Sequence, residues 1–491
     1  MNNIDTYKLN FKLLSRLTGD MLHIMSILML IPLIISWVTH DGVALPLLFS
    51  LLSMLVVGTL LRFTLGRHAT YSILERDSFW ITSVIWIVTP LLGSLPYLFS
   101  GVFSSFTNAV FESFSGFTTT GASMVTNPQL LPTGILVWRS LTQWVGGLGL
   151  ILFLVALIRG LQEGGNRLYA AEFSGTVQRK LHPHISNSVG RMWRIYLALT
   201  LVMIGALIIA GNPVIDSLCL AMSTISTGGF TTHAAGMSYY NEATLIIVTI
   251  FMFLSGINVA LLYQFVTFHP KTLFKDEEFR LYIFLYVITV IACLFGFLHA
   301  GNPFKNSLGY SLFHVASTFS TCGFYIDSPH HWSMLVSVIT FFFVFIGASA
   351  GSVGGGMKMK RIMIIFQYVR HYLLRVIHPQ AVFTVRVNGN TIGTDYINRI
   401  FAFVFLYLLF VAGGALVLTC CGCDIPDAVC MAAANMSNLG PSPLINNLGA
   451  ELNYMTLPAA AKWTLMVLML AGRIEIFALI AIFSPAYWRK K

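Results

Sequence analysis

Four short strips of the chain carry residues whose backbone oxygens could bind a cation. In each strip a glycine follows or interrupts a run of Thr, Ser or Asn. Strips 1 to 4 read FTTTGAS at 117–123, ISTGGFT at 225–231, FSTCGFY at 319–325 and MSNLGPS at 436–442. A dehydrated alkali cation needs several oxygen ligands around it, and ion filters supply them from rings of backbone carbonyls. One strip offers one side of a ring, so four strips predict a complete ring.

The aligned glycine of each strip has a conformational reason. Pointing successive carbonyls in one direction requires positive φ angles, which glycine adopts without a Cβ penalty. The four glycines are Gly121, Gly229, Gly323 and Gly440. Any one strip could be an ordinary turn. The fourfold recurrence instead indicates an internally repeated architecture and favours a pore.

A fairly apolar stretch that is too short to cross a bilayer precedes each strip, which is typical of re-entrant pore helices. In three cases a good N-cap residue, Asn108, Asp216 or Asp427, stands at the same distance before the glycine. Before strip 3 we expect the helix to begin at Asn306 or Ser307. Because helix C-terminal ends carry partial negative charge, such helices aimed at an ion path would favour cations.

The elements that position these strips are predicted to be membrane-spanning helices. Of the 491 residues, 56% are hydrophobic and only 10% are charged, whereas soluble domains carry about 25% charged residues. Apolar stretches long enough to span the hydrocarbon core recur along the chain. We expect spans at 21–39, 44–66, 79–100, 135–158, 195–211, 244–265, 281–299, 334–377 (interrupted), 398–420 and 460–483. We expect no removable targeting segment.

The basic residues are distributed as in a multi-pass membrane protein. Nearly all of them lie at the termini or in the loops 62–78, 159–194, 267–280 and 358–399. The segments that hold the strips contain only Lys305. Short cytoplasmic loops collect Lys and Arg, so both termini are predicted to be cytoplasmic. The same rule explains the net charge of +10 without a nucleic-acid partner.

The fold class follows from these patterns: an all-α polytopic membrane protein with two extra N-terminal transmembrane helices and four helix, pore-loop, helix repeats. The repeats would have pseudo-fourfold symmetry around one central pore. We expect an N-terminal extension at 1–78, repeat 1 at 79–194, repeat 2 at 195–278, repeat 3 at 279–397 and repeat 4 at 398–491. Repeat 3 would contain an intramembrane gating loop at 347–357.

A glycine-rich run interrupts the eighth expected span. Its glycines are Gly347, Gly351, Gly354, Gly355 and Gly356. Each glycine weakens a helix by about 1 kcal/mol, so the run predicts a break in the middle of the membrane. A phosphate-binding loop is the alternative, but the run lacks the adjacent Gly-Lys-Ser/Thr signature of such loops.

Arg473 lies in the middle of the last expected span, where a charge costs about 2.5–3.5 kcal/mol on insertion scales. Glu475, two residues later, cannot share its helix face, so carbonyls of the glycine-rich run are the expected partners. Arg473 would hold that run closed and repel cations, or it could have a packing role only. Arg139 is expected to be structural, while Glu112 could either buttress the strips or add negative potential at the pore mouth.

The seven cysteines are odd in number and lack the spacing of a disulfide framework or a zinc site. Cys420, Cys421 and Cys423 could bind a metal, but small residues at the end of a helix are the favoured interpretation. A membrane-embedded enzyme is also disfavoured, because it would need facing ionisable groups inside the spans and few are present.

The strips, together with four further segments, resemble the Trk/Ktr/HKT superfamily of K⁺ transporters, most closely the bacterial TrkH/TrkG membrane subunits. The further segments are WRSLTQWVGGLGLI at 138–151, GASAGSVGGGMK at 347–358, HPQAVFTVRVNG at 378–389 and GRIEIFALIAIFSP at 472–485. The resemblance covers nearly the whole chain. It implies K⁺ uptake across the bacterial cytoplasmic (inner) membrane, with a gate formed by the glycine-rich run and Arg473.

The resemblance also implies which residues form the K⁺ filter. They are Thr118, Thr119, Thr120, Gly121, Ser226, Thr227, Gly228, Gly229, Ser320, Thr321, Cys322, Gly323, Asn438, Leu439 and Gly440. The carbonyls expected to bind K⁺ are those of Thr119, Thr120, Thr227, Gly228, Thr321, Cys322, Asn438 and Leu439. Some plant relatives with a serine at the first glycine prefer Na⁺, so Gly121 favours K⁺.

The expected partners follow from the same resemblance. They are a second copy of the chain, in a homodimer, and a cytosolic TrkA-type nucleotide-binding regulatory subunit. The basic loops at 159–194 and 358–399 offer that subunit a docking surface, and membrane lipid surrounds the spans. K⁺ would be the transported ion, with no organic cofactor on this chain. The alternative function is a K⁺ symporter coupled to H⁺ or Na⁺, since such transporters also use broken helices at mid-membrane.

Overall fold

A computed structural model describes residues 9–69, 75–150, 185–267, 270–301, 303–326, 333–378, 380, 384–440 and 454–484. The end of the fourth expected span, at 151–158, lies outside these residues. So do most of the basic loop at 159–194 and the segment that follows strip 4.

Within the described residues, six helical runs are long and apolar enough to cross a membrane, or up to seven if one bent pair counts as a span. They are Phe11–Thr39, Ala44–Leu65, Asp77–Phe99, Val189–Ile209, Glu277–His299 and Thr394–Cys420. The described strands, β1 (Arg386–Val387) and β2 (Asn390–Thr391), form one small hairpin. The prediction of an all-α polytopic membrane protein is therefore confirmed at this level.

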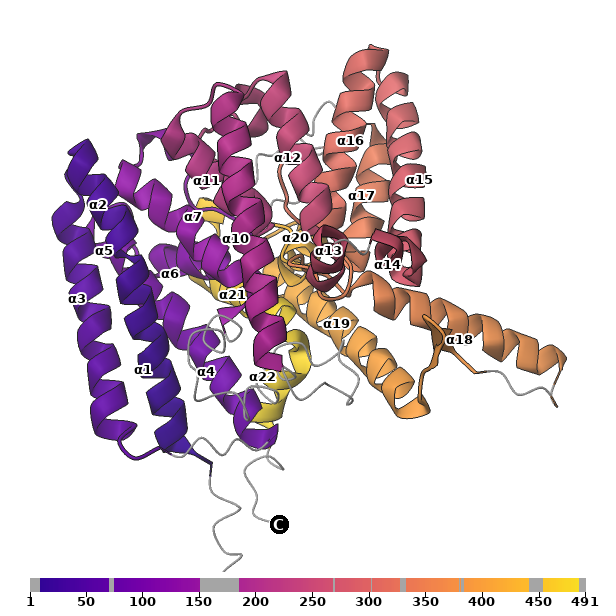
Figure 1. Ribbon diagram of the computed structural model, residues 1–491, viewed down its shortest axis with the longest axis horizontal. Coiled ribbons are helices and arrows are strands. Elements are labelled where there is room, and N and C mark those ends of the chain that lie inside the picture. The colour runs from indigo at the N-terminus through magenta and orange to yellow at the C-terminus, as the bar shows by residue number, and fades with distance from the viewer. Residues whose placement is uncertain are drawn as a thin grey trace, which may run out of the picture.

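The N-terminal helices form an antiparallel pair at one side of the bundle (Figure 1). The pair consists of α1 (Phe11–Leu28), α2 (Leu30–Thr39) and α3 (Ala44–Leu60), which continues as a π-helical turn to Leu65. Small residues let membrane helices approach closely, and Gly19 of α1 lies directly against the Gly58 carbonyl of α3. This pair packs on α4, α5 and α7.

The order long helix, short helix, strip, helix then recurs four times. The elements around strip 1 are α4 (Glu75–Gly93), α5 (Leu95–Phe99), α6 (Phe106–Phe117) and α7 (Thr133–Leu148). Those around strip 2 are α10 (Ile185–Ile209), α11 (Val214–Ile225), α12 (Glu242–Ser255) and α13 (Val259–Val266). Those around strip 3 are α15 (Glu277–His299), α16 (Phe304–Ser320), α17 (Met334–Ile346) and α18 (Met359–Ile377). Those around strip 4 are α19 (Thr394–Cys420), α20 (Ile425–Met436), α21 (Ala459–Arg473) and α22 (Glu475–Phe483).

Shorter pieces join these helices: α14 (Pro270–Lys275) and the 3₁₀ turns η2 (Pro128–Leu130), η4 (Gly236–Tyr239) and η7 (Tyr454–Thr456). α1 begins and α22 ends on the same side of the bundle (Figure 1). An even number of crossings would produce this arrangement.

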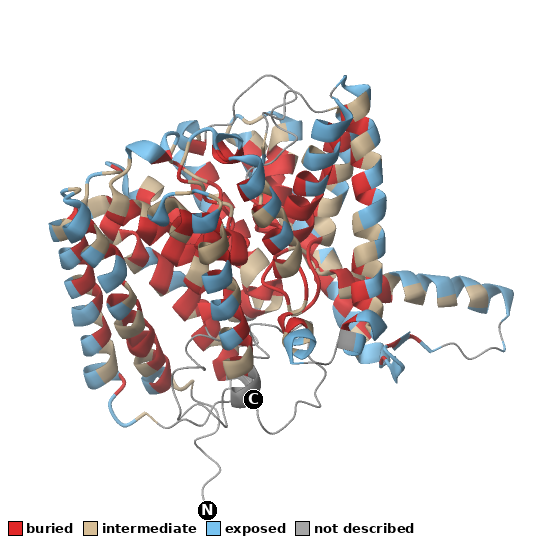
Figure 2. Cartoon of the chain, turned by 45° about the horizontal axis from the view of Figure 1, so that its top comes forward, coloured by how far each residue is buried: buried red, intermediate tan, exposed pale blue. Residues whose placement is uncertain are grey.

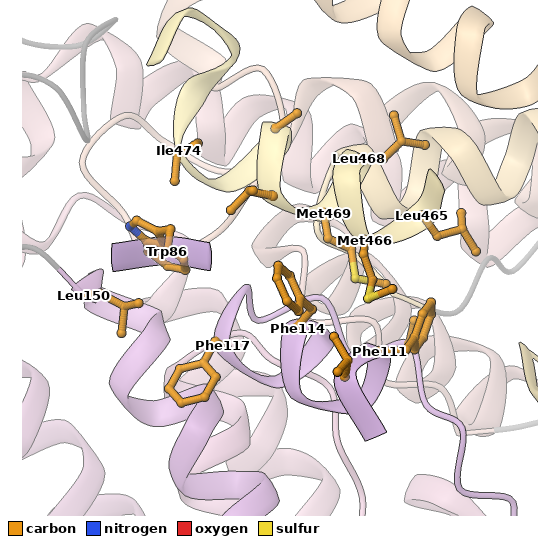
Figure 3. Packing of buried hydrophobic residues seen from close by; sticks show 14 of the residues in the cluster. Trp86, Phe111, Phe114, Phe117, Leu150, Leu465, Met466, Leu468, Met469 and Ile474 are labelled. Atoms are coloured by element: carbon orange, nitrogen blue, oxygen red, sulfur yellow. The ribbon is translucent and has the colours of Figure 1, made fainter. Parts of the chain in front are cut away.

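The buried apolar residues form two main clusters. One joins the N-terminal helices to the elements around strips 1 and 4, and the other joins the elements around strips 2 and 3. In the first cluster, Phe111 and Phe114 of α6 lie beside Met466 and Met469 of α21, which is far away in sequence (Figure 3). Phe117 points to the other side of α6 and packs edge-on against Trp138 of α7. Buried residues concentrate in the middle of the bundle (Figure 2).

Three expected spans are broken. The pair α12 and α13, which covers the span expected at 244–265, is bent by 108°. The span expected at 460–483 breaks between α21 and α22, where Glu475 has a left-handed φ of 55°. The interruption of the eighth span is present between α17 and α18, but α18 does not complete the crossing. It projects sideways from the bundle and is largely exposed (Figures 1 and 2).

The expected helix starts before the strips were wrong. α6, α11 and α20 begin at Phe106, Val214 and Ile425, so Asn108, Asp216 and Asp427 each occupy the third helical position. The first turn still suits Asp216 and Asp427, because their charge stabilises the positive end of the helix dipole. α16 begins at Phe304, directly after Pro303, and neither Asn306 nor Ser307 caps it. Proline fixes φ near the helical value and so starts a helix without a polar cap.

Candidate functional site

Each of the four short helices ends in the same backbone geometry. The residue two positions before the aligned glycine has a left-handed conformation, and so does the glycine. The φ angles are 55° and 82° for Thr119 and Gly121, 57° and 80° for Thr227 and Gly229, 59° and 81° for Thr321 and Gly323, and 54° and 84° for Asn438 and Gly440. Two left-handed residues flanking one ordinary residue turn consecutive carbonyls away from the helical direction.

The hydrogen bonds of this turn are also equivalent in the four strips. In strip 1 the N–H of Thr119 donates to the carbonyl of Gly116, and the N–H of Thr120 donates to the carbonyl of Ser115, both at 2.9 Å. The corresponding two bonds occur in strips 2, 3 and 4. This pattern is the Schellman motif, which ends a helix by satisfying its last carbonyls.

Threonine and asparagine replace the usual glycine of the motif. A β-branched residue in the left-handed region costs about 1–3 kcal/mol and persists only where the surroundings enforce it. The sequence predicted the positive φ of the glycines and missed that of Thr119, Thr227, Thr321 and Asn438. A Thr or Asn two positions before the aligned glycine, at the end of a short helix, is the signal that could have suggested it.

The four strips lie next to one another. A Cβ added to Gly121 would overlap the carbonyl oxygen of Gly228, and one added to Gly229 would overlap that of Cys322. One added to Gly440 would overlap the carbonyl oxygen of Thr120. These contacts link strip 4 to strip 1, strip 1 to strip 2 and strip 2 to strip 3. The structure thus brings the predicted filter residues together, although each comes from a different part of the chain.

Buried polar side chains brace the strips. The Gln143 amide of α7 donates to the carbonyl of Gly228 at 2.7 Å and accepts a hydrogen bond from the Ser223 hydroxyl at 2.8 Å. The amide of Asn438 donates to the Thr120 hydroxyl at 3.0 Å and to the carbonyl of Met469 at 2.9 Å. The sequence analysis missed Gln143, since a lone Gln in an apolar helix carries no distinctive pattern.

A buried ion pair lies behind strips 1 and 2. Arg139 Nε lies 2.8 Å from Glu112 Oε1, and their side chains are 2% and 0% exposed. Glu112 also accepts hydrogen bonds from the N–H of Met124 at 2.7 Å and from the Ser123 hydroxyl at 3.0 Å, at the end of strip 1. The Arg139 guanidinium stacks on the Phe230 ring of strip 2, 4.1 Å from its centre.

This network decides between the two roles considered for Glu112. Its charge is compensated by Arg139 inside the protein, so it braces the strips rather than adding negative potential at a pore mouth. Arg139 is structural, as the sequence analysis expected.

The glycine-rich segment 347–358 lies directly against strips 3 and 4. The N–H of Gly355 donates to the Thr321 hydroxyl at 2.6 Å. A Cβ on Gly354 would meet the carbonyl of Ser320, and one on Gly355 would overlap that of Ser437. Glycine is required here because the backbone of the segment touches the backbone of the strips.

The first half of this segment is held by other elements. The N–H of Ser349 donates to the carbonyl of Gly256, and the N–H of Val259 donates to the carbonyl of Gly351, both at 3.1 Å. The N–H of Ala350 donates to the buried carboxylate of Glu278 at 2.5 Å. The break between α12 and α13 is therefore where the segment docks, which a continuous span at 244–265 could not have allowed.

Arg473 contacts the second half of the segment, as expected from the sequence. Its guanidinium donates to the carbonyl of Val353 at 3.0 Å, to that of Gly146 at 2.5 Å and to that of Gly147. Arg473 thus links the segment to the end of α7. A second cation that the sequence analysis missed, Lys358, donates to the carbonyl of Gly354.

A small cavity lies under the strips at this place. Its lining includes Gly354, Gly355, Lys358, Arg361, Arg473 and Glu475. Basic side chains outnumber the single carboxylate in this lining, so the cavity disfavours a cation in the conformation described.

Residues 48–490 match the family profile TrkH, described as a cation transport protein. This chain belongs to the TrkH family. The Trk system potassium uptake protein TrkH of Vibrio parahaemolyticus is 35% identical to it over 492 residues, which cover 98% of this chain and 100% of that protein. Membership in a transport family confirms the prediction that this TrkH-family chain is not an enzyme.

Other relatives agree. The Trk system potassium uptake protein TrkH of Escherichia coli K12 is 32% identical over 489 residues, covering 98% of this chain and all of that protein. The crystal structure of the potassium transporter TrkH from Vibrio parahaemolyticus matches the fold with a TM-score of 0.88 at 32% identity, over 98% of this chain and 100% of that one.

The cysteine cluster lies away from the strips. Cys420 is the last residue of α19, and Cys421 and Cys423 follow it as free thiols. No group of three potential metal ligands occurs among the residues described. The position of the three cysteines, at and just after the end of α19, agrees with the interpretation as small residues at a helix end.

Proposed function

We propose that this TrkH-family chain takes up K⁺ across the bacterial cytoplasmic membrane through one central pore. The observation that carries the proposal is the contact of four equivalent strips, each with a left-handed residue two positions before a left-handed glycine. The names of the relatives, which are potassium uptake proteins, support K⁺ as the ion. The pore would have pseudo-fourfold symmetry, with one strip from each of the four repeats.

The filter would replace the hydration shell of K⁺ with backbone carbonyls. The proposed ligands are the carbonyls of Thr119, Thr120, Thr227, Gly228, Thr321, Cys322, Asn438 and Leu439. The four helices α6, α11, α16 and α20 end at the strips. Their negative dipole ends would therefore face the ion.

The gate would be the glycine-rich segment with Arg473. Its direct contact with strips 3 and 4, and its hydrogen bond to Arg473, support a closed pore in the conformation described. Opening would require the second half of the segment to leave the strips. Arg473 would then stop contributing positive charge beneath the filter.

The proposed topology keeps both termini in the cytoplasm and the repeat boundaries at 79–194, 195–278, 279–397 and 398–491. We also propose a homodimer that binds a TrkA-type regulatory subunit. The exposed apolar side chains of α18 support a contact with a second copy. They include Phe366, Tyr372, Leu373, Val376 and Ile377. Apolar patches of this kind mark interaction surfaces.

Growth of a K⁺-uptake-deficient bacterium at low K⁺ tests the proposal. The wild-type chain, expressed with its regulatory partner, should restore growth, and Gly121→Ser should not, because the added side chain would overlap the Gly228 carbonyl. Gly413→Ala is the matched control, since nothing lies within 4 Å of a Cβ there. Failure of the wild-type chain to restore growth would overturn the assignment.

The alternative is a K⁺ symporter coupled to H⁺ or Na⁺. Discontinuous helices with ionisable residues near mid-membrane are typical of secondary transporters. Within the described residues three expected spans are broken, and the buried Glu278 carboxylate accepts a hydrogen bond from Ala350 in one of the breaks. Uptake of K⁺ into proteoliposomes with and without each ion gradient discriminates the two. Uptake that stops when the H⁺ and Na⁺ gradients are removed would favour the symporter.

A further inference from the structure

A second buried ion pair lies in the lining of the cavity next to the glycine-rich segment. Arg361 Nη2 is 2.7 Å from Glu475 Oε1, and the side chains are 2% and 9% exposed. The Arg361 guanidinium also stacks on the Phe403 ring of α19, 4.0 Å from its centre. Removing one partner of a buried pair leaves the other charge uncompensated, so the two side chains constrain each other strongly.

Glu475 sits at a conformational break. It has a φ of 55° and is the first residue of α22, two residues after Arg473, which is the last residue of α21. A left-handed residue other than glycine is strained, and such strain persists where the surrounding contacts enforce it. The ion pair with Arg361 is one such contact, so it helps fix the direction in which α21 presents Arg473.

Arg361 stands at the base of α18, immediately after the glycine-rich segment. The N–H of Met359 donates to the carbonyl of Ala348 at 3.0 Å, which ties the first residue of α18 to the segment. Beyond its first turns, α18 leaves the bundle and is exposed (Figure 1). Arg361 therefore lies between the exposed part of α18 and the glycine-rich segment, so a movement of α18 would displace Arg361 first.

We propose that the Arg361–Glu475 ion pair is a positioning element of the gate. It ties the base of α18 to the break between α21 and α22, and so holds Arg473 on the carbonyl of Val353. Displacement of α18 separates the pair, releases Arg473 and frees the second half of the glycine-rich segment. This inference rests on the proposed gate, and it adds the route by which the exposed helix controls that gate.

The test uses the full-length chain in proteoliposomes, with Rb⁺ as the transported probe. Glu475→Gln and Arg361→Met should each raise basal Rb⁺ flux about tenfold, a usual size for coupling between two sites. The preference for K⁺ over Na⁺ should stay unchanged, because the strips are untouched. Arg361→Lys keeps the charge but loses the planar contact with Phe403, so it should give a smaller rise.

The charge-reversed double variant, Arg361→Glu with Glu475→Arg, should return the flux toward the wild-type value. Flux equal to wild type in the folded single variants would overturn the positioning role. So would a folded double variant that fails to restore flux. Should the single variants fail to fold, the flux of the double variant decides alone.

Arg473→Ala separates this inference from the proposed function. If Arg473→Ala raises flux and the ion-pair variants do not, only the ion-pair inference fails. If neither the wild-type chain nor Arg473→Ala carries Rb⁺, the proposed function fails, and the inference fails with it.

Discussion

The four strips and the glycine-rich segment both consist of irregular backbone in the middle of the molecule, yet they are held in different ways. The strips are repeated four times, each fixed to its own helix by the same pair of hydrogen bonds. They also brace one another through backbone contacts and buried side chains such as Gln143 and Asn438. The glycine-rich segment occurs once in the sequence, so no equivalent segment packs against it.

The segment depends on a small number of separate contacts. Glu278 and the backbone of Gly256 and Val259 hold its first half, and Thr321 and Arg473 hold its second half. Redundant contacts make a structure insensitive to the loss of any one, whereas a few single contacts allow a second conformation. In the proposed function, this difference corresponds to a rigid filter formed by the strips and a gate formed by the segment. Each prediction below tests whether the strips and the segment respond differently to substitution.

The largest effect on transport is expected from a side chain added where two strips touch. Gly440→Ala places a methyl group onto the carbonyl oxygen of Thr120 at a residue with a φ of 84°. Transport of K⁺ should fall by more than about tenfold, because the strain of alanine in a left-handed conformation adds to the cost of the steric overlap. Rb⁺ flux in proteoliposomes measures it. Gly205→Ala, where a Cβ meets nothing within 4 Å, should keep wild-type flux.

Breaking the ion pair between Glu112 and Arg139 should lower both the stability of the protein and its preference for K⁺ over Na⁺. Glu112→Gln leaves Arg139 buried without its counter-charge, which costs about 3–5 kcal/mol. We expect a lower Tm in detergent and a reduced preference for K⁺ over Na⁺. Glu242→Gln is the matched control, because Glu242 and Lys305 form an exposed pair, 80% and 82% accessible, and such pairs contribute little. Equal Tm values for Glu112→Gln and wild type would contradict the bracing role.

Arg473→Ala should act in the opposite direction on flux. It removes hydrogen bonds to Val353, Gly146 and Gly147 together with a positive charge beneath the strips. Basal Rb⁺ flux should rise at least about tenfold, as in the ion-pair variants that act through Arg473, while the ratio of K⁺ to Na⁺ flux stays constant. A change in that ratio would show that the filter and the segment are one mechanical unit.

The smallest effect is expected where the two regions touch. Thr321→Val removes the hydroxyl that accepts the hydrogen bond from Gly355, and one such bond contributes about 1 kcal/mol. Basal flux should rise by a factor of about five. Thr321→Ser keeps the hydroxyl and should behave like wild type. Should both variants match wild type, this hydrogen bond plays no part in holding the segment closed.

Part of this architecture could be predicted from the sequence because it depends on local patterns. Apolar length predicted the long spans, the fourfold glycine motif predicted the strips, and the glycine run predicted the break before Met359. The partner of Arg473 was also predictable, since a charge within the membrane requires nearby oxygens. Most of these inferences use patterns within short segments of the chain, and the inference about Arg473 uses only the cost of a charge within the membrane.

Only the tertiary structure decided the remaining features, because they depend on residues distant in sequence. Gln143 reaches Gly228, Glu112 pairs with Arg139, and Arg361 pairs with Glu475. The bend between α12 and α13 and the sideways course of α18 depend on what packs beside them. Local sequence determines how far a helix can run, but contacts across the bundle determine where it breaks and which buried charges meet.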